Sequence, residues 1–419
     1  MQARLSIADP TASSTGLTLR RFLPQSGNPA AWFLAAGLCA ATASIAVSEI
    51  FLSAALVVRL WNLIRRREKL NLAPVFIPWS IWAAIELIAW LCAPGPRAGF
   101  GEVRHILLAA ALFLLIPALE SVPDRVLVWR GIIAVATISS AALILHFTYQ
   151  VLFYRGNLPP IVYLRGGGLL HHWMIYGTAE ILVFAGLLEV TRFYPAQRWW
   201  LIPVWCVNVL AIVLSLTRML WICCFFLLTL DLIWRRSRWV LALPLVPLAL
   251  FLLAPAAVRT RIVVSANPEY YSNAERLQML RVGARMIHDH PFTGVGPGRV
   301  EPLYRSYLQP DESAPAYYGH LHNNAMQFAA QSGLPALCAA AVFVAILFRQ
   351  LWRRYREARS RELIFLCRAG ILACTGFLAS GFFDYSYGHS IGIILVYFTA
   401  LAPLVCEQRS NLSGNLRRW

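Results

Sequence analysis

Long apolar stretches alternate with short polar ones along almost the whole chain. A helix needs about 20 apolar residues to cross a bilayer, so this pattern predicts about twelve transmembrane helices. We expect the first two to form a tight hairpin around Glu49, although joining them would give eleven spans. The predicted spans are 30–47, 50–64, 74–93, 106–118, 126–152, 173–190, 199–216, 219–234, 239–257, 335–349, 366–383 and 390–405. The predicted fold class is therefore an all-α polytopic membrane protein.

The longest polar interval separates the ninth predicted span from the tenth, and it divides the chain. We expect a cytoplasmic N-terminal tail over 1–29 and transmembrane helices 1–9 over 30–257. A large loop with amphipathic helices and the active-site residues follows over 258–323. Transmembrane helices 10–12 then occupy 324–406, and 407–419 form a cytoplasmic C-terminal tail.

Composition and charge support this interpretation and orient it. The chain has 419 residues, of which 58% are hydrophobic and only 14% charged, which is too little charge for a soluble domain of this length. The net charge of +17 is almost wholly arginine, because Lys69 is the only lysine. Cytoplasmic loops collect such cations. With the N-terminus inside, the arginine-rich segments 65–69, 192–198, 235–238, 349–361 and 409–418 all fall on the cytoplasmic side, so 258–323 lies outside.

Outside the cytoplasm, arginines are candidates for binding phosphate groups. Arg218 lies in a turn of very few residues between two predicted spans, where an ionisable group indicates a functional site. The alternative is an arginine that extends to the membrane surface. The glycine run at 166–168 follows Arg165 in an external loop suited to contacting a ligand.

The segment from Asn273 to His288 is predicted to be an amphipathic helix, capped by Asn273 and ended before Pro291. Arg276 lies in its first turn beside the apolar stripe, which favours an inward-facing ligand. We expect Arg281 and Arg285, on another face, to lie against lipid phosphates. The predicted stripe consists of Leu277, Leu280, Ala284 and Ile287.

His322 precedes a second predicted helix over 323–331, which Gly333 and Pro335 break. The positive end of a helix dipole disfavours an imidazolium ion there. A neutral imidazole is what a general base requires, although a histidine that only caps the helix is the alternative. His320 and His322 lack the spacing of a zinc site, and the nine cysteines form no CxxC pair, so we expect no metal and no cofactor.

Several familiar motifs are absent or misleading. GVGPG at 294–298 follows a helix and a proline, and no Gly-Lys-Ser/Thr sequence accompanies it, so it does not indicate a nucleotide site. These glycines instead allow a turn before another helix near 299–308. The chain has no Asp-x-Asp pair for a nucleotide-sugar metal and no Gly-x-Ser-x-Gly elbow.

At these residues the chain resembles the O-antigen ligase family. The family pattern Arg-x-x-x-Leu is matched by Arg276 and Leu280. His322, Asn323 and Gly333 match the pattern His-(Asn/Ser/Gln), nine residues, Gly-x-x-Gly, with Ala336 at the place of the second glycine. The turn Ser-x-Thr-Arg that ends at Arg218 and the stretch HPFTGVGPG are also similar to the family.

The resemblance implies a GT-C-type glycosyltransferase at the periplasmic face of the bacterial inner membrane. Its donor would be a glycan on undecaprenyl pyrophosphate, and its acceptor a sugar hydroxyl of lipid A–core, among membrane lipids and without nucleic acid. With arginines in place of a divalent cation we expect a metal-independent reaction, and direct attack of the acceptor on the anomeric carbon predicts inversion. The catalytic residues would be His322, Arg276 and Arg218, and the predicted substrate contacts are Arg165, Asn323, His320, Arg261 and Arg305. Alternatives are a polymerase or protein O-oligosaccharyltransferase with the same donor, and a transporter of lipid-linked glycans.

Overall fold

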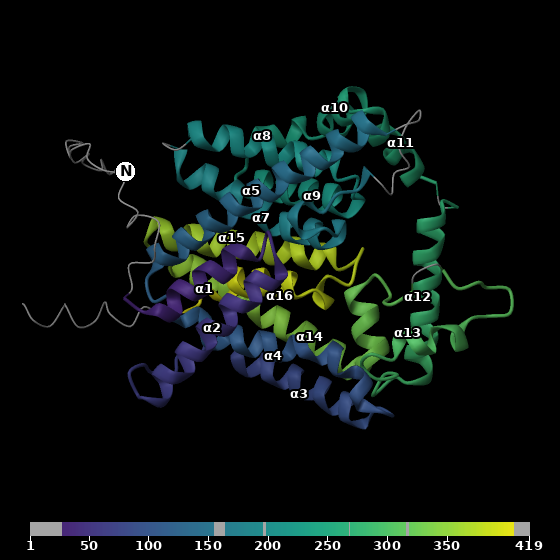
Figure 1. Cartoon of the computed structure of the whole chain (residues 1–419), viewed down its shortest axis with the longest axis horizontal. Coiled ribbons are helices and arrows are strands. Elements are labelled where there is room, and N and C mark those ends of the chain that lie inside the picture. The colour runs from purple at the N-terminus through teal and green to yellow at the C-terminus, as the bar shows by residue number, and fades with distance from the viewer. Residues whose placement is uncertain (1–26, 155–163, 196–197, 268, 316–317, 406–419) are drawn as a thin grey trace, which may run out of the picture.

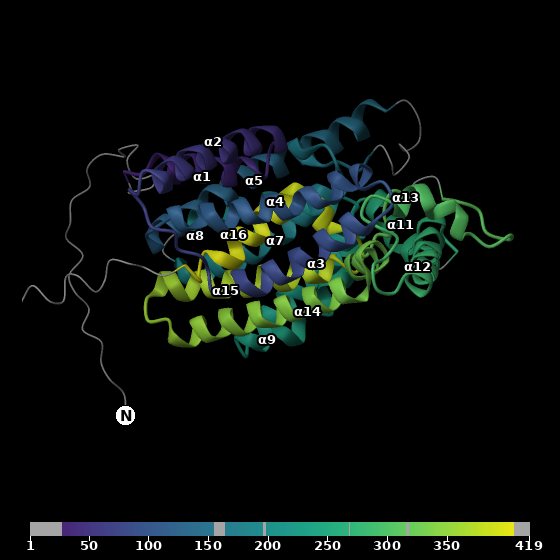
Figure 2. The same ribbon diagram turned by 90° about the horizontal axis from the view of Figure 1, so that it is seen from below.

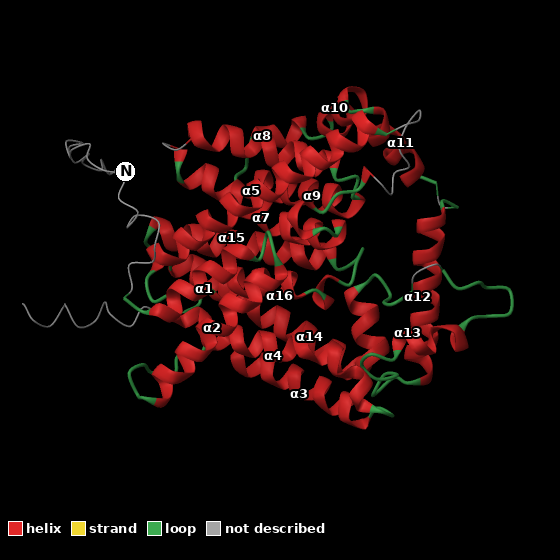
Figure 3. Cartoon of the chain, in the orientation of Figure 1, coloured by secondary structure: helices red, strands yellow, loops and turns green. Residues whose placement is uncertain are grey.

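Helices make up every regular element of the described chain (Figure 3). The structure is a computed structural model that describes residues 27–154, 164–195, 198–267, 269–315 and 318–405. Within these ranges no strand occurs. The predicted all-helical class is confirmed for this part of the chain.

The α-helices form two groups, and the smaller group lies between the two parts of the larger one along the chain. The first and last parts hold α1 (Pro29–Ala40), α2 (Ile45–Ile64), α3 (Phe76–Cys92), α4 (Phe100–Leu115), α5 (Val122–Phe153), α7 (Trp173–Phe193), α8 (Arg198–Leu214), α9 (Arg218–Trp234), α10 (Leu245–Leu253), α14 (Asn324–Glu357), α15 (Arg361–Ser380) and α16 (Ser390–Leu401). Between α10 and α14 lie α11 (Ala256–Ser265), α12 (Tyr271–Asp289) and α13 (Val300–Leu303). Short 3₁₀ turns join several of them, including η6 (Arg238–Ala242), η7 (Tyr304–Tyr307) and η8 (Ser386–Gly388).

Length and composition make six of the described helices able to cross a bilayer. They are Ile45–Ile64, Phe100–Ala118, Val122–Phe153, Trp173–Phe193, Asn324–Glu357 and Arg361–Ser380. Shorter apolar helices occur at Pro29–Ala40, Phe76–Cys92, Trp199–Leu214 and Ser390–Leu401. These helices support a membrane protein, whereas the count of twelve spans stays a prediction.

The centre of the bundle is α7, which packs against α15, α9 and α16. A helix that is buried on all sides must satisfy its charged groups internally. Glu189 of α7 accepts a hydrogen bond of 2.8 Å from Nε of Arg368 on α15. Nη2 of the same arginine donates to Asp231 on α9 at 3.1 Å. All three side chains are buried, so this ion-pair cluster links three helices.

The helices α12 and α13 stand at one end of the bundle, beyond the ends of α9 and α3 (Figures 1 and 2). The start of α1 and the arginine-rich connection from α14 to α15 lie at the opposite end (Figure 1). The polar interval between α10 and α14 is therefore gathered at a single end of the molecule.

The observed helices depart from the predicted spans most clearly at two places. The hairpin turns at 41–44 and not around Glu49, because the Oγ of Ser44 caps the start of α2 and Glu49 lies inside that helix. The predicted span 239–257 is broken into η6 and the nine-residue α10. Pro244 and Pro255 stand before α10 and before α11, and proline lacks the N–H that a continuous helix needs.

The helix predicted over 273–288 is present as α12, but its cap was predicted wrongly and its apolar stripe only partly correctly, since Ile287 packs against the buried cluster. Tyr270 precedes the helix, and Asn273 lies inside it. Leu277 is 52% exposed, and Ala284 is exposed as well. The buried stripe consists of Met279, Val282, Gly283 and Met286. This face packs with Val295, Tyr304 and Leu321, whose positions depend on chain distant from the helix.

The predicted break at Gly333 is confirmed as a kink in α14, where this glycine has φ 83°. The kink removes helical partners from nearby carbonyl groups, and the 291–298 segment replaces them. The N–H groups of Val295 and Gly296 donate to Ala330 and Gln331 at 2.8 and 3.0 Å. A Cβ at Gly294 or Gly333 would collide with the opposite backbone, so these glycines permit the close approach. Their role is structural, and it fixes the first part of α14.

Candidate active site

A cavity of about 490 Å³ lies where α12 faces the ends of several helices of the bundle. Its walls come from the segment before α7, the start of α9, α11, α12, the segment before α14, and the connection from α15 to α16. The cavity is rich in ionisable groups. Those that line it are Arg165, Arg218, Arg261, Arg276, Glu275, Asp384, His172, His320, His322 and His389.

The clearest functional geometry in this cavity is a histidine paired with a buried carboxylate. Nδ1 of His322 lies 2.9 Å from Oδ1 of Asp384. Asp384 has no exposed surface, and its other oxygen lies 3.6 Å from Nε2 of His389. Burial acts to raise the pKa of Asp384, but the contacts with His322 and His389 outweigh it and hold this pKa well below its usual value. Asp384 is thus an ionised acceptor at neutral pH.

The ionised carboxylate determines which imidazole nitrogen carries hydrogen. A carboxylate only accepts hydrogen bonds, so Nδ1 of His322 carries the proton when the imidazole is neutral. Nε2 is then the basic nitrogen, and His322 lines the cavity. The arrangement suits a general base that is oriented by a third group.

The backbone around His322 is tied to the loop that carries Asp384. His322 has φ 48°, a left-handed conformation that a histidine adopts only where its surroundings hold it. Directly after it, the side chain of Asn323 caps α14 by accepting from the N–H of Met326 at 3.0 Å. The N–H of Asn324 donates to the carbonyl of Gly381 at 2.7 Å, and its Oδ1 accepts from the N–H of Tyr387 at 3.3 Å.

His320 supports His322 from the other side. The two ring centroids are 4.2 Å apart, and Nδ1 of His320 accepts from the backbone N–H of His322 at 3.2 Å. Burial and the neighbouring His322 lower the pKa of His320 to about 3, although Asp384 acts against this shift. His320 is therefore neutral, and it acts as a hydrogen-bond acceptor beside the pair.

Two of the predicted arginines are held by contacts with the protein. The guanidinium of Arg218 donates to Oδ1 of Asn273 at 2.5 Å and to Oγ of Ser272 at 2.9 Å. These bonds join the start of α9 to the first turn of α12. Arg261 donates to the carbonyl of Leu216 at 3.3 Å and to the hydroxyl of Tyr270 at 3.4 Å. Both side chains border the cavity in fixed positions.

The other two arginines have no hydrogen-bonding partner among the described residues. Arg276 lines the cavity and makes no hydrogen bond or ion pair with any residue that the structure describes. Nε of Arg165 is buried and unsatisfied, and its guanidinium lies 5.4 Å from the ring centre of Trp173. Leaving a buried guanidinium nitrogen unsatisfied is costly. Arg165 therefore favours an anionic ligand in the cavity, and the charge of Arg276 is available to the same ligand.

The electrostatic environment of Arg276 supports the same ligand. Burial, together with the neighbouring cations Arg218 and Arg261, lowers the pKa of Arg276, and Asp384 only partly opposes this. An arginine nevertheless remains charged in proteins. Four guanidinium groups and only two carboxylates line the cavity, so a bound anion would relieve the repulsion between the arginines.

Not every predicted site residue borders the cavity. Asn323 caps α14, and its Nδ2 donates to the carbonyl of Phe382 at 3.4 Å. Arg305 lies in η7, where its Nε donates to the hydroxyl of Tyr318 at 3.1 Å. Neither is among the residues that line the cavity. Arg285, expected against lipid, instead pairs with Glu312 through two hydrogen bonds of 2.6 and 2.9 Å.

A metal ion would find ligand groups here but an unfavourable charge. His320, His322 and Asp384 place one ligand atom each within 4.8 Å of one another, a set that suits a transition metal. The direct contact between His322 and Asp384 already occupies two of these groups. Four surrounding guanidinium groups repel a divalent cation. The charge of the cavity thus favours an anion.

The place of Asp384 beside His322 was not predicted from the sequence. The sequence did contain a signal. Asp384 directly follows a predicted span, and the predicted topology places it on the same side of the membrane as His322. Distances between loops that lie 62 residues apart are set by helix packing, so the pairing itself required the structure.

The family model described as O-antigen ligase matches residues 204–341. The match covers less than half of the chain and supports the resemblance to the O-antigen ligase family there. The matched region contains Arg218, Arg261, Arg276 and His322, whereas Asp384 and Arg165 lie outside it. No curated protein matches the chain.

Proposed function

We propose that this chain is a member of the O-antigen ligase family and transfers a glycan from undecaprenyl pyrophosphate to a sugar hydroxyl of lipid A–core. The observation that carries the proposal is the pairing of His322 with the buried Asp384 at the edge of a cavity lined by four arginines. The cavity offers a basic nitrogen for the acceptor and positive charge for a pyrophosphate. The family match supports activity of the ligase or polymerase type.

The proposal includes a membrane arrangement with twelve spans of GT-C-like organisation. The segment 258–323 is periplasmic, and the regions 1–29 and 407–419 are cytoplasmic, with 30–257 and 324–406 in the inner membrane. The arrangement is supported by the position of α12 and α13, which lie at the end opposite the arginine-rich connection from α14 to α15 (Figure 1). A lipid-linked donor then reaches the cavity from the bilayer.

In the donor complex, the arginines hold the pyrophosphate. Guanidinium groups bind phosphate oxygens in a planar, two-point geometry. Arg218, held by Ser272 and Asn273, forms one side of the proposed pyrophosphate site. Arg276 supplies a positive charge that no hydrogen bond to a described residue engages. Arg165 and Arg261 border the same cavity and complete the electrostatic environment. Charge that develops on the departing pyrophosphate is stabilised as the glycosidic bond breaks.

In the reaction step, His322 acts as the general base. Nε2 removes the proton of the acceptor hydroxyl while the hydroxyl oxygen attacks the anomeric carbon of the donor sugar. The bond from that carbon to the pyrophosphate oxygen breaks, and the electron pair leaves with undecaprenyl pyrophosphate. Asp384 stabilises the imidazolium that forms. A single displacement of this kind inverts the anomeric configuration, and the arginines supply the positive charge without a divalent metal.

The remaining predicted contact residues would bind parts of the substrates other than the pyrophosphate. His320 lies next to His322 in the cavity wall, where we propose that it contacts the acceptor. We propose that Asn323 keeps the base at the start of α14 through its capping bond. Arg305 is a predicted contact for a part of the glycan that extends beyond the cavity.

The decisive experiment uses purified protein in lipid nanodiscs, with a defined undecaprenyl-pyrophosphate-linked glycan and lipid A–core as the acceptor. Wild-type protein should form the new glycosidic bond, and His322→Ala should not. His288→Ala is the matched control, because His288 lies on α12 with its side chain 88% exposed and outside the cavity. Transfer at the wild-type rate by His322→Ala would contradict the base assignment.

The same assay distinguishes other functions. Transfer to a second lipid-linked glycan, or to a protein hydroxyl but not to lipid A–core, would replace the ligase with a polymerase or protein O-oligosaccharyltransferase. Movement of the donor across the bilayer without a new glycosidic bond would indicate a transporter and overturn the proposal.

A further inference from the structure

The residues adjacent to His322 and Asp384 are joined by a second, buried connection. Leu321 precedes His322 in the chain, and Tyr385 follows Asp384. Two glutamines of the first part of α14, Gln327 and Gln331, lie between these neighbours. They have 3% and 1% of their surface exposed.

Each link of this connection is a hydrogen bond. The backbone N–H of Leu321 donates to Oε1 of Gln327 at 2.9 Å. Nε2 of Gln327 donates to Oε1 of Gln331 at 3.0 Å, and Nε2 of Gln331 donates to the hydroxyl of Tyr385 at 3.5 Å. With the contact between His322 and Asp384, the links form a closed ring through two chain segments. We call it the glutamine ring.

The amide orientations in the ring are mutually determined. Because the N–H of Leu321 needs an acceptor, the oxygen of Gln327 must face it, and its amide nitrogen then faces Gln331. The same logic turns the nitrogen of Gln331 toward Tyr385. A buried backbone N–H without an acceptor is costly, so the ring resists rearrangement.

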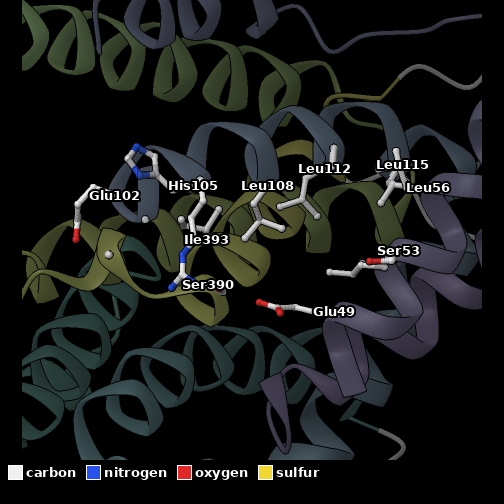
Figure 4. Close-up of a pocket in the computed structure, with 15 residues that line it drawn as sticks. Glu49, Ser53, Leu56, Glu102, His105, Leu108, Leu112, Leu115, Ser390 and Ile393 are labelled. Atoms are coloured by element: carbon white, nitrogen blue, oxygen red, sulfur yellow. The ribbon is translucent and has the colours of Figure 1, made fainter. Parts of the chain in front are cut away.

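The far side of the ring reaches a second cavity. The hydroxyl of Tyr385 donates to Oε2 of Glu102 at 3.5 Å. Glu102 and His105 lie at one end of a cavity of about 260 Å³ between α2, α4 and the start of α16 (Figure 4). Tyr385 itself is only 3% exposed, so its hydroxyl has a fixed acceptor as well as a fixed donor.

We propose that Gln327, Gln331 and Tyr385 are positioning residues that hold His322 at bonding distance from Asp384. The inference rests on the proposed function of His322 as the base. The left-handed backbone of His322 is strained, and Asp384 belongs to a different loop. The ring fixes both segments to the rigid start of α14, which the kink at Gly333 and the 291–298 segment hold in place.

The test compares tyrosine variants that differ only in which hydroxyl is lost. Tyr385→Phe removes the hydroxyl that joins Gln331 to Glu102. Tyr387→Phe is the matched control, because its hydroxyl is also buried but bonds to Tyr397 at 2.8 Å, outside the ring. We expect Tyr385→Phe to lower kcat about tenfold and Tyr387→Phe to leave it near the wild-type value.

Substitutions of Gln327 provide the stronger test, because one variant should lose activity and a second variant should recover part of it. Gln327→Met leaves the N–H of Leu321 without an acceptor, and a misplaced catalytic group costs about a hundredfold in rate. Gln327→Glu retains the acceptor oxygen and should recover part of the lost kcat. Because the arginines are untouched, KM for the lipid-linked donor should stay within about twofold in both variants.

The outcomes separate this inference from the proposed function. If wild-type protein transfers no glycan, the proposed function fails. If wild-type protein is active and Gln327→Met and Tyr385→Phe have wild-type kcat, the positioning role is overturned. A parallel increase in donor KM, or equal losses in Gln327→Glu and Gln327→Met, would also overturn it, since either indicates general damage and not a displaced base.

Discussion

Nδ1 of His322 and Oδ1 of Asp384 are 2.9 Å apart, although 62 residues separate them in the chain. The carboxylate is fully buried, and the imidazole borders the arginine-lined cavity. A buried acid that bonds one nitrogen of a histidine fixes both the tautomer and the ring direction. The basic nitrogen of His322 is thereby defined before any substrate binds.

Replacing Asp384 tests this relationship directly. Asp384→Asn keeps the size of the side chain but removes its charge, so it no longer stabilises the imidazolium and no longer selects one tautomer. We expect kcat for glycan transfer to fall on the order of 10³-fold, with little change in donor KM. Initial rates at saturating donor measure the effect.

A matched acidic position is available as the control. Asp311→Asn alters an exposed carboxylate in the connection after η7, away from the cavity, and should retain the wild-type rate. A wild-type kcat for Asp384→Asn would show that the tautomer of His322 does not limit the reaction.

Arg276 should determine donor affinity more than any other residue of α12. It has no hydrogen-bonding partner among the described residues, so its charge is available to a pyrophosphate. Arg276→Ala should raise donor KM and lower kcat/KM by about 100-fold, since a bond between charged groups contributes about 1.5–3 kcal/mol. Arg276→Lys should recover only part, because an ammonium group lacks the planar two-point geometry.

Arg281→Ala is the control for the arginine series, because Arg281 lies on an exposed part of the same helix. Binding of a labelled, non-transferable undecaprenyl pyrophosphate analogue, measured in nanodiscs, separates affinity from chemistry. Equal binding by Arg276→Ala and wild-type protein would show that Arg276 does not bind the pyrophosphate.

Much of the helical scaffold could be predicted because apolar runs and breaker residues act locally. The helix at 271–289, the kink at Gly333 and the helix that begins after Asn323 all follow from such signals. The expectation of one continuous helix over 239–257 was wrong because mean hydropathy does not register how Pro244 and Pro255 interrupt backbone hydrogen bonding. The face that α12 buries was missed because it depends on Val295 and Leu321, which approach from other segments.

The residues of the candidate site also differ in whether local sequence signals could predict them. Arg276 and His322 carry local signals, namely a helix start and a charged or titratable side chain beside an apolar segment. Gln327 and Gln331 carry none, since a buried polar residue within a helix resembles ordinary helix packing. Asp384 carries only its position directly after a predicted span, on the same side of the membrane as His322. Their significance arises from distances between the loops that precede α14 and follow α15.

The pairing of Arg285 with Glu312 gives a prediction of pH dependence. Hydrogen bonds from Arg285, together with the backbone N–H of Gln309, lower the pKa of Glu312 from 4.5 to about 2. Because the pKa of Glu312 is lower in the folded state than in the unfolded state, the stabilisation that its ionised form gives the fold is complete above about pH 4.5. It is lost as the pH falls through about 2.

The contact ties α12 to the connection after η7, so the effect should be local. Hydrogen exchange of residues 304–315 should accelerate between pH 4.5 and 2, after correction for the intrinsic rate. Glu312→Gln should show fast exchange across the whole range. Unchanged protection in Glu312→Gln would mean that the ion pair does not hold the connection.

The charge of the cavity also predicts how metal ions affect activity. Because arginines supply the positive charge at the pyrophosphate, treatment with EDTA should leave the rate of glycan transfer unchanged. Added Zn²⁺ should inhibit only at concentrations high enough to overcome repulsion by the four guanidinium groups, since His320, His322 and Asp384 together can bind it and would withdraw the base. Inhibition should be reversed by EDTA and should weaken in His320→Ala, because one of the three ligands is then missing. Loss of activity with EDTA, restored by a divalent cation, would show instead that the arginines alone do not stabilise the leaving pyrophosphate.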